Sequence, residues 1–428
     1  MTKFPSTIVQ ALAASAFFSG TSLSLSPFSS KSSTTSAKTT SAITDLMHEA
    51  AVAETERLFQ FYSSNGNYNT ENTENNNYPT KIEASPVITS PPTVWRSSEE
   101  AVTYIRDNID TVLFDCDGVL YRTTSLCPGA SECIRELMEI HHKRVLFVTN
   151  NAGVNRRELR EKLSRLLRID SLTNDQMISS SYSSAQYLKS ELMAASKELG
   201  STTTASSTPP RVHVIGSSGL CEELVAAGFN VTGGPSTSSP EHDECCSMSR
   251  EELAAYDFEQ LHPIDALVVG HDTDLNFRKL CIAENLLLRN PEALFVATNK
   301  DSFDVVDGNN NDLRHIMGNG ATVVALEYSS KRTAINVGKP SKELFGLIRN
   351  QDSSGAKKPS GNVFDDPSRC LFVGDRLDTD IRFGKDNGMK SLLVMTGVTS
   401  AKTMEELANG TEEEPLPDFI LPHVGMLI

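Results

Sequence analysis

The sequence predicts an α/β protein: a Rossmann-like parallel-sheet core with an inserted α/β cap domain. After Val94, short apolar runs rich in β-branched residues alternate with amphipathic segments, as in a parallel sheet covered by helices on both faces. A Ser/Thr-rich stretch at 201–210 breaks this pattern, and a new alternating unit begins at Val212. Four of the apolar runs end in polar residues, and ligands of such sheets bind at the carboxyl ends of the strands.

Residues 1–44 have the composition of a targeting segment. They contain no acidic residue, many Ser and Thr residues and a short apolar stretch from Ile8 to Ala16. The segment resembles a signal peptide fused to a transit peptide, as in algae whose plastids have additional membranes. A plastid location is therefore expected, and a tail without an address on a cytoplasmic protein is the alternative.

Residues 45–93 are expected to hold a helix and then a disordered linker. The linker prediction rests on the Asn run at 75–77 and on Pro86, Pro91 and Pro92. The helix prediction rests on apolar residues at helical spacing. These residues are Leu46, Ala50, Ala53, Leu58 and Phe61.

The core is expected in two parts, residues 94–205 and 331–428, with the cap between them at 206–330. Buried strands are predicted at 111–114, 145–149, 335–337 and 371–373 in the core, and at 212–215, 267–269 and 293–297 in the cap. Helices are predicted after Asn155, which is a suitable amino-terminal cap, near Ser181, and at 280–287.

The bulk composition excludes several classes of function. A net charge of −16 and a pI near 5.1 argue against nucleic-acid partners. No apolar run reaches the length that would span a bilayer in the mature protein. The eight cysteines are scattered, without metal-site spacing, so they are expected to be free thiols. Cys245 and Cys246 are either a redox pair or ordinary surface thiols.

The first chemically suggestive segment ends the run at 111–114. Asp115 and Asp117 follow it two residues apart, and Gly118 permits a sharp exit of the chain. Because side chains alternate along a strand, both carboxylates start on one face and can reach the same small ligand. One could attack phosphorus while the other handles a proton; two solvated aspartates in a turn are the alternative.

Three further strand ends supply complementary groups. Thr149 and Asn150 end one strand and could bind phosphate oxygens. Lys339 ends another and could neutralise the charge of a transferring phosphoryl group. Asp375 ends the fourth and suits a hard cation such as Mg²⁺, with Asp380 one turn further on. Each signal is modest alone, but together they place a hydroxyl, a lysine and several carboxylates around one crevice.

In this order the segments DCDGVL, VTNN, VGKPS and VGDRLDTDI resemble the haloacid dehalogenase superfamily. They look most like its eukaryotic 2-phosphoglycolate and pyridoxal phosphatase branch, which is p-nitrophenylphosphatase-like and carries a large α/β (C2-type) cap. The resemblance extends from Val94 to the carboxyl end. It implies a magnesium-dependent phosphatase for small metabolites.

The resemblance also implies residue roles. Asp115 would be the nucleophile that forms an aspartyl-phosphate, and Asp117 would protonate the leaving oxygen and then activate water. Mg²⁺ would lie between Asp115, the main-chain oxygen of Asp117, and Asp375, with Asp380 in support. Thr149, Asn150 and Lys339 would bind the phosphoryl oxygens.

The expected substrate is 2-phosphoglycolate, because carbon fixation in a plastid generates it. Pyridoxal 5′-phosphate, a broad range of phosphomonoesters, a phosphomutase reaction, and a non-catalytic binding protein on the same fold are the alternatives. Related enzymes place a substrate-contacting loop where this chain has Asp301 to Asn319, which includes His315. That histidine could contact substrate or could be a plain loop residue. A homodimer formed through the cap is also expected.

Overall fold

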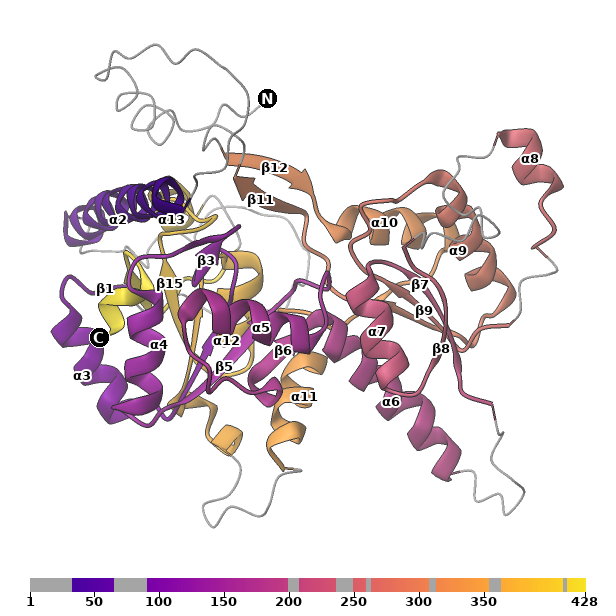
Figure 1. Ribbon diagram of the computed structural model, residues 1–428, viewed down its shortest axis with the longest axis horizontal. Helices are drawn as coiled ribbons and strands as arrows, with labels where there is room; N and C mark the ends of the chain where they lie inside the picture. The colour runs from indigo at the N-terminus through magenta and orange to yellow at the C-terminus, as the bar shows by residue number, and fades with distance from the viewer. Residues whose placement is uncertain are drawn as a thin grey trace, which may run out of the picture.

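The computed structural model describes residues 33–64, 91–198, 208–235, 249–258, 263–307, 313–353, 363–410 and 414–428. Two parallel sheets organise them, each covered by helices, and Figure 1 shows them side by side as a core and a cap. This confirms the α/β class and the Rossmann-like core predicted from the sequence. Part of the predicted linker, residues 65–90, and the pair Cys245–Cys246 lie outside the described residues.

The core sheet has seven parallel strands in the order β1-β16-β15-β14-β2-β5-β6. Their bounds are β1 Thr93–Val94, β2 Thr111–Phe114, β5 Arg144–Thr149, β6 Met177–Ser179, β14 Cys370–Gly374, β15 Lys390–Val394 and β16 Phe419–Leu421. All residues of β2 and β14 are buried, because central strands of a parallel sheet are covered on both faces. The uninterrupted apolar runs in the sequence arise from this burial.

Alternate residues of each core strand pack into opposite layers. In β2, Val112 and Phe114 belong to the cluster formed with α3, α4 and α5, whereas Leu113 belongs to the cluster with α11 and α12. The helices of the core are α2 Ser33–Ser64, α3 Ser98–Asn108, α4 Ala130–Glu139, α5 Arg156–Leu167, α6 Ser180–Glu198, α11 Lys342–Ser353, α12 Arg382–Asp386 and α13 Ala401–Ala408. Asn155 caps α5 in a capping box with Glu158, as its sequence predicted.

The cap sheet has five parallel strands in the order β13-β10-β9-β7-β8. Its elements are β7 Arg211–Ile215, α7 Ser218–Ala226, β8 Asn230–Gly233, α8 Arg250–Ala255, β9 Ala266–Val269, α9 Phe277–Arg289, β10 Leu294–Ala297, α10 Asn319–Ser330 and β13 Ile335–Asn336. Leu267 and Val269 pack with α9 and α10, and Ala266 and Val268 pack with α6 and α7.

Two predicted boundaries need correction. The strand β13 pairs with β10, so the cap sheet continues past residue 330, where the core was expected to resume. The helix α2 begins at Ser33, inside the segment 1–44 that was expected to be a targeting peptide. Ile43 already packs on the core cluster and Thr44 donates to the carbonyl of Leu126. A boundary at residue 44 would therefore cut a packed helix.

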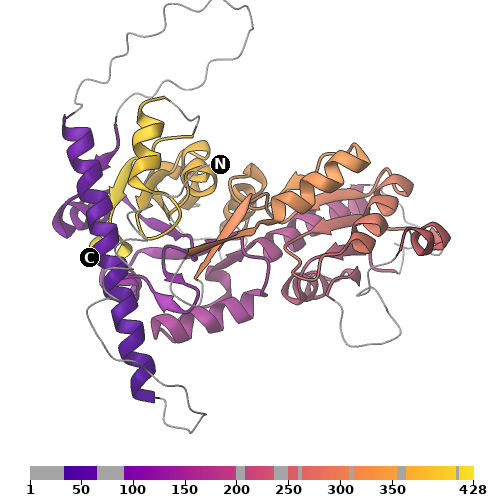
Figure 2. The ribbon, with the colours of Figure 1, turned by 90° about the horizontal axis from the view of Figure 1, so that it is seen from above.

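The segment from Asp301 to Asn319, where the resemblance placed a substrate-contacting loop, forms an antiparallel hairpin of β11 Phe303–Asp307 and β12 Leu313–Met317. Residues 308–312 lie outside the described residues. Both views show this hairpin beside the junction of core and cap (Figures 1 and 2). His315 stacks on Phe303 with ring centroids 4.3 Å apart. None of the described helices is long and apolar enough to cross a membrane.

Candidate active site

The candidate site lies at the carboxyl ends of neighbouring core strands. β2 lies between β14 and β5 in the sheet, so Asp115 emerges between Asp375 and Thr149. The backbone N–H of Asp115 donates to the carbonyl of Val373 over 2.9 Å, which continues the ladder by one residue. The order of the strands therefore brings together side chains that are about 260 residues apart.

Lys339 connects two of these carboxylates. Its Nζ lies 2.5 Å from Oδ1 of Asp115 and 2.8 Å from Oδ1 of Asp380, and all three side chains are buried. A buried charge needs partners of opposite sign, and here one ammonium serves two carboxylates. Lys339, the cation predicted at a strand end, thus contacts Asp115, the predicted nucleophile.

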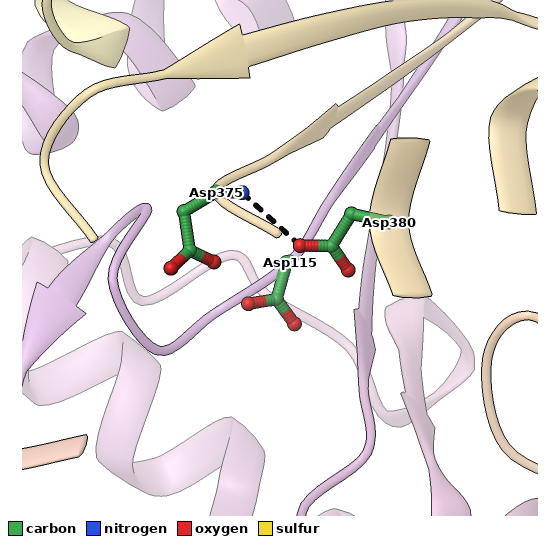
Figure 3. A group of neighbouring side chains, drawn as sticks. All are labelled: Asp115, Asp375 and Asp380. Atoms are coloured by element: carbon green, nitrogen blue, oxygen red, sulfur yellow. Dashed lines mark hydrogen bonds between the residues drawn. The ribbon is translucent and has the colours of Figure 1, made fainter. Parts of the chain in front are cut away.

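Asp115, Asp375 and Asp380 each direct a carboxylate into the same small space (Figure 3), with ligand atoms all within 4.8 Å of one another. Asp380 accepts the backbone N–H of Asp375 over 3.0 Å, and Asp375 accepts the N–H of Val398 over 2.7 Å. Oδ1 of Asp375 is buried and has no hydrogen-bond partner among the described residues. An unsatisfied oxygen beside two more carboxylates is a donor set that fits a hard divalent cation.

Burial and crowding raise the proton affinity of these acids. Burial raises the pKa of Asp115 well above its ordinary value, although Lys339 opposes the shift. Burial, with the neighbouring Asp380, raises the pKa of Asp375 to about 7. Burial would lower the pKa of Lys339, but Asp115 and Asp380 hold it above its usual range. The lysine is therefore charged at neutral pH, and a cation bound among the acids would keep them ionised.

Asp117 lies apart from this cluster, at the entry to a small hairpin of β3 Tyr121–Arg122 and β4 Ser125–Leu126. Its side chain lines the cavity and accepts a hydrogen bond of 3.2 Å from the hydroxyl of Tyr121. Removal from bulk water raises the pKa of Asp117, while Lys162 and Tyr121 oppose the shift. The raised pKa suits a group that carries a proton for part of the time, as a general acid and base must.

Gly118 makes this arrangement possible. It has a φ of 83°, which side-chain-bearing residues rarely adopt, and a Cβ atom there would lie 2.6 Å from Oδ2 of Asp375. The hydroxyl of Thr396 donates to its carbonyl over 2.6 Å. Only a glycine allows the chain to turn directly after Asp117 and pass close to Asp375.

Thr149 and Asn150 differ in what their side chains do. The Thr149 hydroxyl accepts the N–H of Asn151 over 3.1 Å and faces the cavity, so it fits the predicted contact with phosphate. The Asn150 amide instead holds backbone: Oδ1 accepts the N–H of Lys339 over 2.8 Å, and Nδ2 donates to Asp301 over 2.9 Å. Its predicted contact with phosphate stays a prediction, and its observed contacts position Lys339.

Two residues that the sequence did not single out connect the core to the cap hairpin. Arg376 donates from one terminal nitrogen to the carbonyl of Phe303 over 2.9 Å, and its guanidinium lies 4.9 Å from the centroid of that ring. Asp301 accepts from Asn150 across the same junction, and burial raises its pKa to about 6. Arg376 lies in the segment VGDRLDTDI, but no pattern around it indicates a partner in the cap.

All seven predicted site residues line one cavity of about 300 Å³. They are Asp115, Asp117, Thr149, Asn150, Lys339, Asp375 and Asp380. The opposite wall includes His271 of the cap, whose Nδ1 lies 3.5 Å from Asp304, and Arg122 of the β3–β4 hairpin. His315 is absent from this lining. The cavity is small, and polar groups surround it from both domains.

Comparison with known proteins agrees with this geometry. A model of the haloacid dehalogenase-like hydrolases matches residues 112–230, and a second model of such hydrolases matches residues 336–427. The chain belongs to the haloacid dehalogenase-like hydrolases, and within them it is a phosphoric monoester hydrolase with a cap domain.

Among curated relatives, phosphoglycolate phosphatase 2 of Arabidopsis thaliana is 36% identical over 75% of this chain and 93% of its own length. The chloroplastic phosphoglycolate phosphatase 1A of the same plant is 32% identical, over 74% and 78%. Glycerol-3-phosphate phosphatase of Gallus gallus is 34% identical, over 78% and 95%. These relatives share the activity class and differ in the substrate that their names give.

Among solved structures, p-nitrophenyl phosphatase from Archaeoglobus fulgidus superposes with a TM-score of 0.54 at 23% identity. The match covers 98% of that chain and 75% of this one. This likeness supports the shared fold of core and cap.

Proposed function

We propose that this protein hydrolyses 2-phosphoglycolate to glycolate and phosphate with Mg²⁺, through an aspartyl-phosphate on Asp115. The observation that carries the mechanism is the contact of Asp115 with Lys339 at 2.5 Å, beside two further carboxylates. A charged lysine keeps one oxygen of the nucleophile ionised and reduces its repulsion of an anionic ester. Mg²⁺, held by Asp115, the main-chain oxygen of Asp117 and Asp375 with Asp380 in support, would supply additional positive charge for the transferring phosphoryl group.

The remaining residues take roles that fit their positions. Asp117 donates a proton to the leaving oxygen, and in the second step it removes a proton from the attacking water. Thr149 donates its hydroxyl to a phosphoryl oxygen, and Asn150 keeps Lys339 in place. Splitting hydrolysis into formation and cleavage of an acyl phosphate replaces one difficult step by two easier ones.

The preference for 2-phosphoglycolate rests on the relatives and on the shape of the site. Two of the relatives described above carry that substrate in their names. The cavity of about 300 Å³ suits a small ester. Arg122 in its wall offers a positive charge for a carboxylate. His271 would offer a second one when protonated, and its hydrogen bond with Asp304 raises its pKa.

The test is phosphate release from 2-phosphoglycolate, glycerol 3-phosphate, pyridoxal 5′-phosphate and p-nitrophenyl phosphate, with Mg²⁺ and with a chelator. Asp115→Asn is the control, because it keeps the shape of the side chain and removes the nucleophile. We expect kcat/KM for 2-phosphoglycolate to exceed the others at least tenfold and to vanish in the control. Higher turnover of another ester would reject the assigned substrate, and an isomerised product without free phosphate would indicate a mutase.

We also propose a plastid location and a homodimer. The first is supported by the acid-free amino-terminal composition and by chloroplastic relatives. A fusion of residues 1–42 to a fluorescent protein tests it, and diffuse cytoplasmic fluorescence would contradict it. The homodimer rests on family resemblance, and a native mass equal to one chain would contradict it.

A further inference from the structure

The helix α2 is a long element that precedes both segments matched by the family models. It spans Ser33–Ser64, whereas the two family matches cover 112–230 and 336–427. The solved p-nitrophenyl phosphatase is matched over 98% of its length without a quarter of this chain. Both views place α2 along the outer side of the core, next to α13 (Figures 1 and 2), and α2 and α13 are in contact. The contacts of α2 with the core therefore bear on what this additional helix does.

One face of α2 is buried in the core. Ala51 and Leu58 are 1% and 0% exposed, and they belong to a cluster that includes Leu377 and Ile381. Those two residues begin and end the π-helical turn Leu377–Ile381, and Asp380 lies within that turn. The outer side of the turn is thus covered by the α2 cluster, while its inner side holds Lys339 and the backbone of Asp375.

Polar contacts connect α2 to the first residues of α13. Glu54 accepts the backbone N–H of Ala401 over 2.5 Å, where a carboxylate also interacts favourably with the dipole of α13. Arg57 forms two hydrogen bonds of 2.6 Å with Glu405. Three residues before Ala401, Val398 donates its N–H to Asp375. The helix α2 therefore fixes the segment that holds the predicted metal ligand.

The first half of α2 contacts the hairpin β3–β4. The hydroxyl of Thr44 donates to the carbonyl of Leu126 over 3.3 Å, and His48 lies 2.8 Å from His423, nitrogen to nitrogen. The same hairpin carries Arg122 in the cavity wall and Tyr121, which donates to Asp117.

We propose that α2 is a permanent part of the catalytic domain, and that it positions the Asp375 segment and the β3–β4 hairpin for the reaction. The proposal rests on the roles proposed above for Asp375 and Asp117. It makes α2 a positioning element that touches no substrate. It also requires that any processing of the amino terminus leaves the chain from Ile43 onward.

The full-length chain offers a matched pair of variants for the test. Ala51→Glu places a carboxylate at a buried position, and Val52→Glu makes the same change in charge at the next position, which is 38% exposed. Burying an unpaired charge is costly, so Ala51→Glu should release α2 from the core. Release is measured by protease cleavage within α2. Function is measured by kcat and KM for p-nitrophenyl phosphate and by the half-saturating Mg²⁺ concentration.

We expect Ala51→Glu to make α2 sensitive to protease, to raise the half-saturating Mg²⁺ concentration at least fivefold and to lower kcat/KM at least tenfold. Val52→Glu should stay within twofold of the unmodified chain on every measure. Released α2 with unchanged kinetics would overturn the proposal, because the helix would then be an appendage. Continued protection of α2 in Ala51→Glu would overturn it too, since the packing would be wrong.

Two further measurements keep the outcome decisive. If Ala51→Glu fails to fold, Arg57→Glu takes its place and should weaken the activation by Mg²⁺. The exchanged pair Arg57→Glu/Glu405→Arg should restore that activation. Unchanged Mg²⁺ activation in Arg57→Glu, with α2 released, would refute the proposal. If the chain hydrolyses none of the esters, the proposed function fails. The rise in Tm caused by Mg²⁺ alone should then still be smaller in Ala51→Glu than in Val52→Glu, and equal rises would refute the role of α2.

Discussion

Replacing Lys339 by methionine should destabilise the folded chain, because Asp115 and Asp380 would lose the cation that they share. The lysine lies 2.5 Å from Asp115 and 2.8 Å from Asp380 with 2% of its side chain exposed. Removal of one partner from a buried ion pair costs about 3–5 kcal/mol, because the remaining charge is buried without compensation. Here two carboxylates lose their common cation, so we expect a loss of this size in the free energy of unfolding at pH 8 without Mg²⁺.

The loss should shrink as the pH falls. Burial already raises the pKa of Asp115 above its ordinary value, and Lys339 opposes the rise, so its removal raises the pKa further. A carboxyl whose pKa is higher in the folded chain stabilises the fold when protonated, and that contribution disappears as the pH rises through the folded pKa. One additional proton changes the stability by at most about 1.4 kcal/mol per pH unit. The deficit of Lys339→Met should therefore fall by up to about 3 kcal/mol between pH 8 and pH 6.

Denaturant titrations with a chelator at both pH values measure the deficit, and kcat/KM for p-nitrophenyl phosphate measures the chemistry. We expect a fall of about 100-fold to 1000-fold, as for loss of a preorganised charge-stabilising group. Lys279→Met is the matched control, because Lys279 is buried and lies 2.7 Å from one carboxylate, Asp272, in the cap. It should lose stability and keep kcat/KM within threefold. A pH-independent deficit below 1 kcal/mol for Lys339→Met would refute the reasoning.

Three other changes have defined outcomes. Asp117→Asn should reduce kcat for 2-phosphoglycolate at least tenfold more than for p-nitrophenyl phosphate, whose good leaving group needs little protonation; equal losses would argue against a general acid. Asp375→Asn should raise the half-saturating Mg²⁺ concentration at least tenfold in an activity titration, while loss of kcat alone would exclude a ligand role. Tyr121→Phe removes a hydrogen bond that lowers the pKa of Asp117. The limb of the pH–rate profile that reports Asp117 should therefore move to higher pH. A limb that stays in place or moves to lower pH would be inconsistent with the contact.

The strands and their chemistry could be predicted because they depend on local pattern. Buried parallel strands give uninterrupted apolar runs, and a polar residue after each run marks the edge where ligands bind. Asp115, Thr149 and Asp375 follow three neighbouring strands, and the structure brings them to one cavity. Their order in the chain, together with the spacing of Asp380, was sufficient to expect a cluster of acids.

The contacts between domains could not be predicted, because they depend on how two sheets meet. Arg376 binds the carbonyl of Phe303, and a backbone acceptor leaves no mark in the sequence. Asp301 begins the stretch where the resemblance placed a loop, whereas the residues after it pair as a hairpin. The contacts of Asn150 with the backbone of Lys339 and the carboxylate of Asp301 were not expected, while its predicted contact with phosphate stays a prediction.

The buried face of the helix α2 was predicted only in part. Leu58 is buried and Phe61 packs on the same cluster, as predicted. The predicted Leu46, Ala50 and Ala53 are not buried, and the structure buries Met47, Ala51, Thr55 and Tyr62. Apolar residues occur at adjacent positions, as in Leu46–Met47 and Ala50–Ala51, so two neighbouring faces fit a helical pattern. Only the partner surface decides which of them is buried. That surface is formed by residues near the carboxyl end of the chain.

The edge strand β13 has a consequence for the exchange of caps between relatives. It belongs to the cap sheet through its pairing with β10, and three residues after Asn336 the chain reaches Lys339. Gly338 lies against the carbonyl of Thr298 in the cap and the amide of Asn150 in the core. A chimera that grafts a foreign cap at residues 206–330 would thus separate β13 from its native neighbour and misplace the ammonium. A graft that ends after Lys339 would instead move the cap that selects the substrate and the catalytic lysine together.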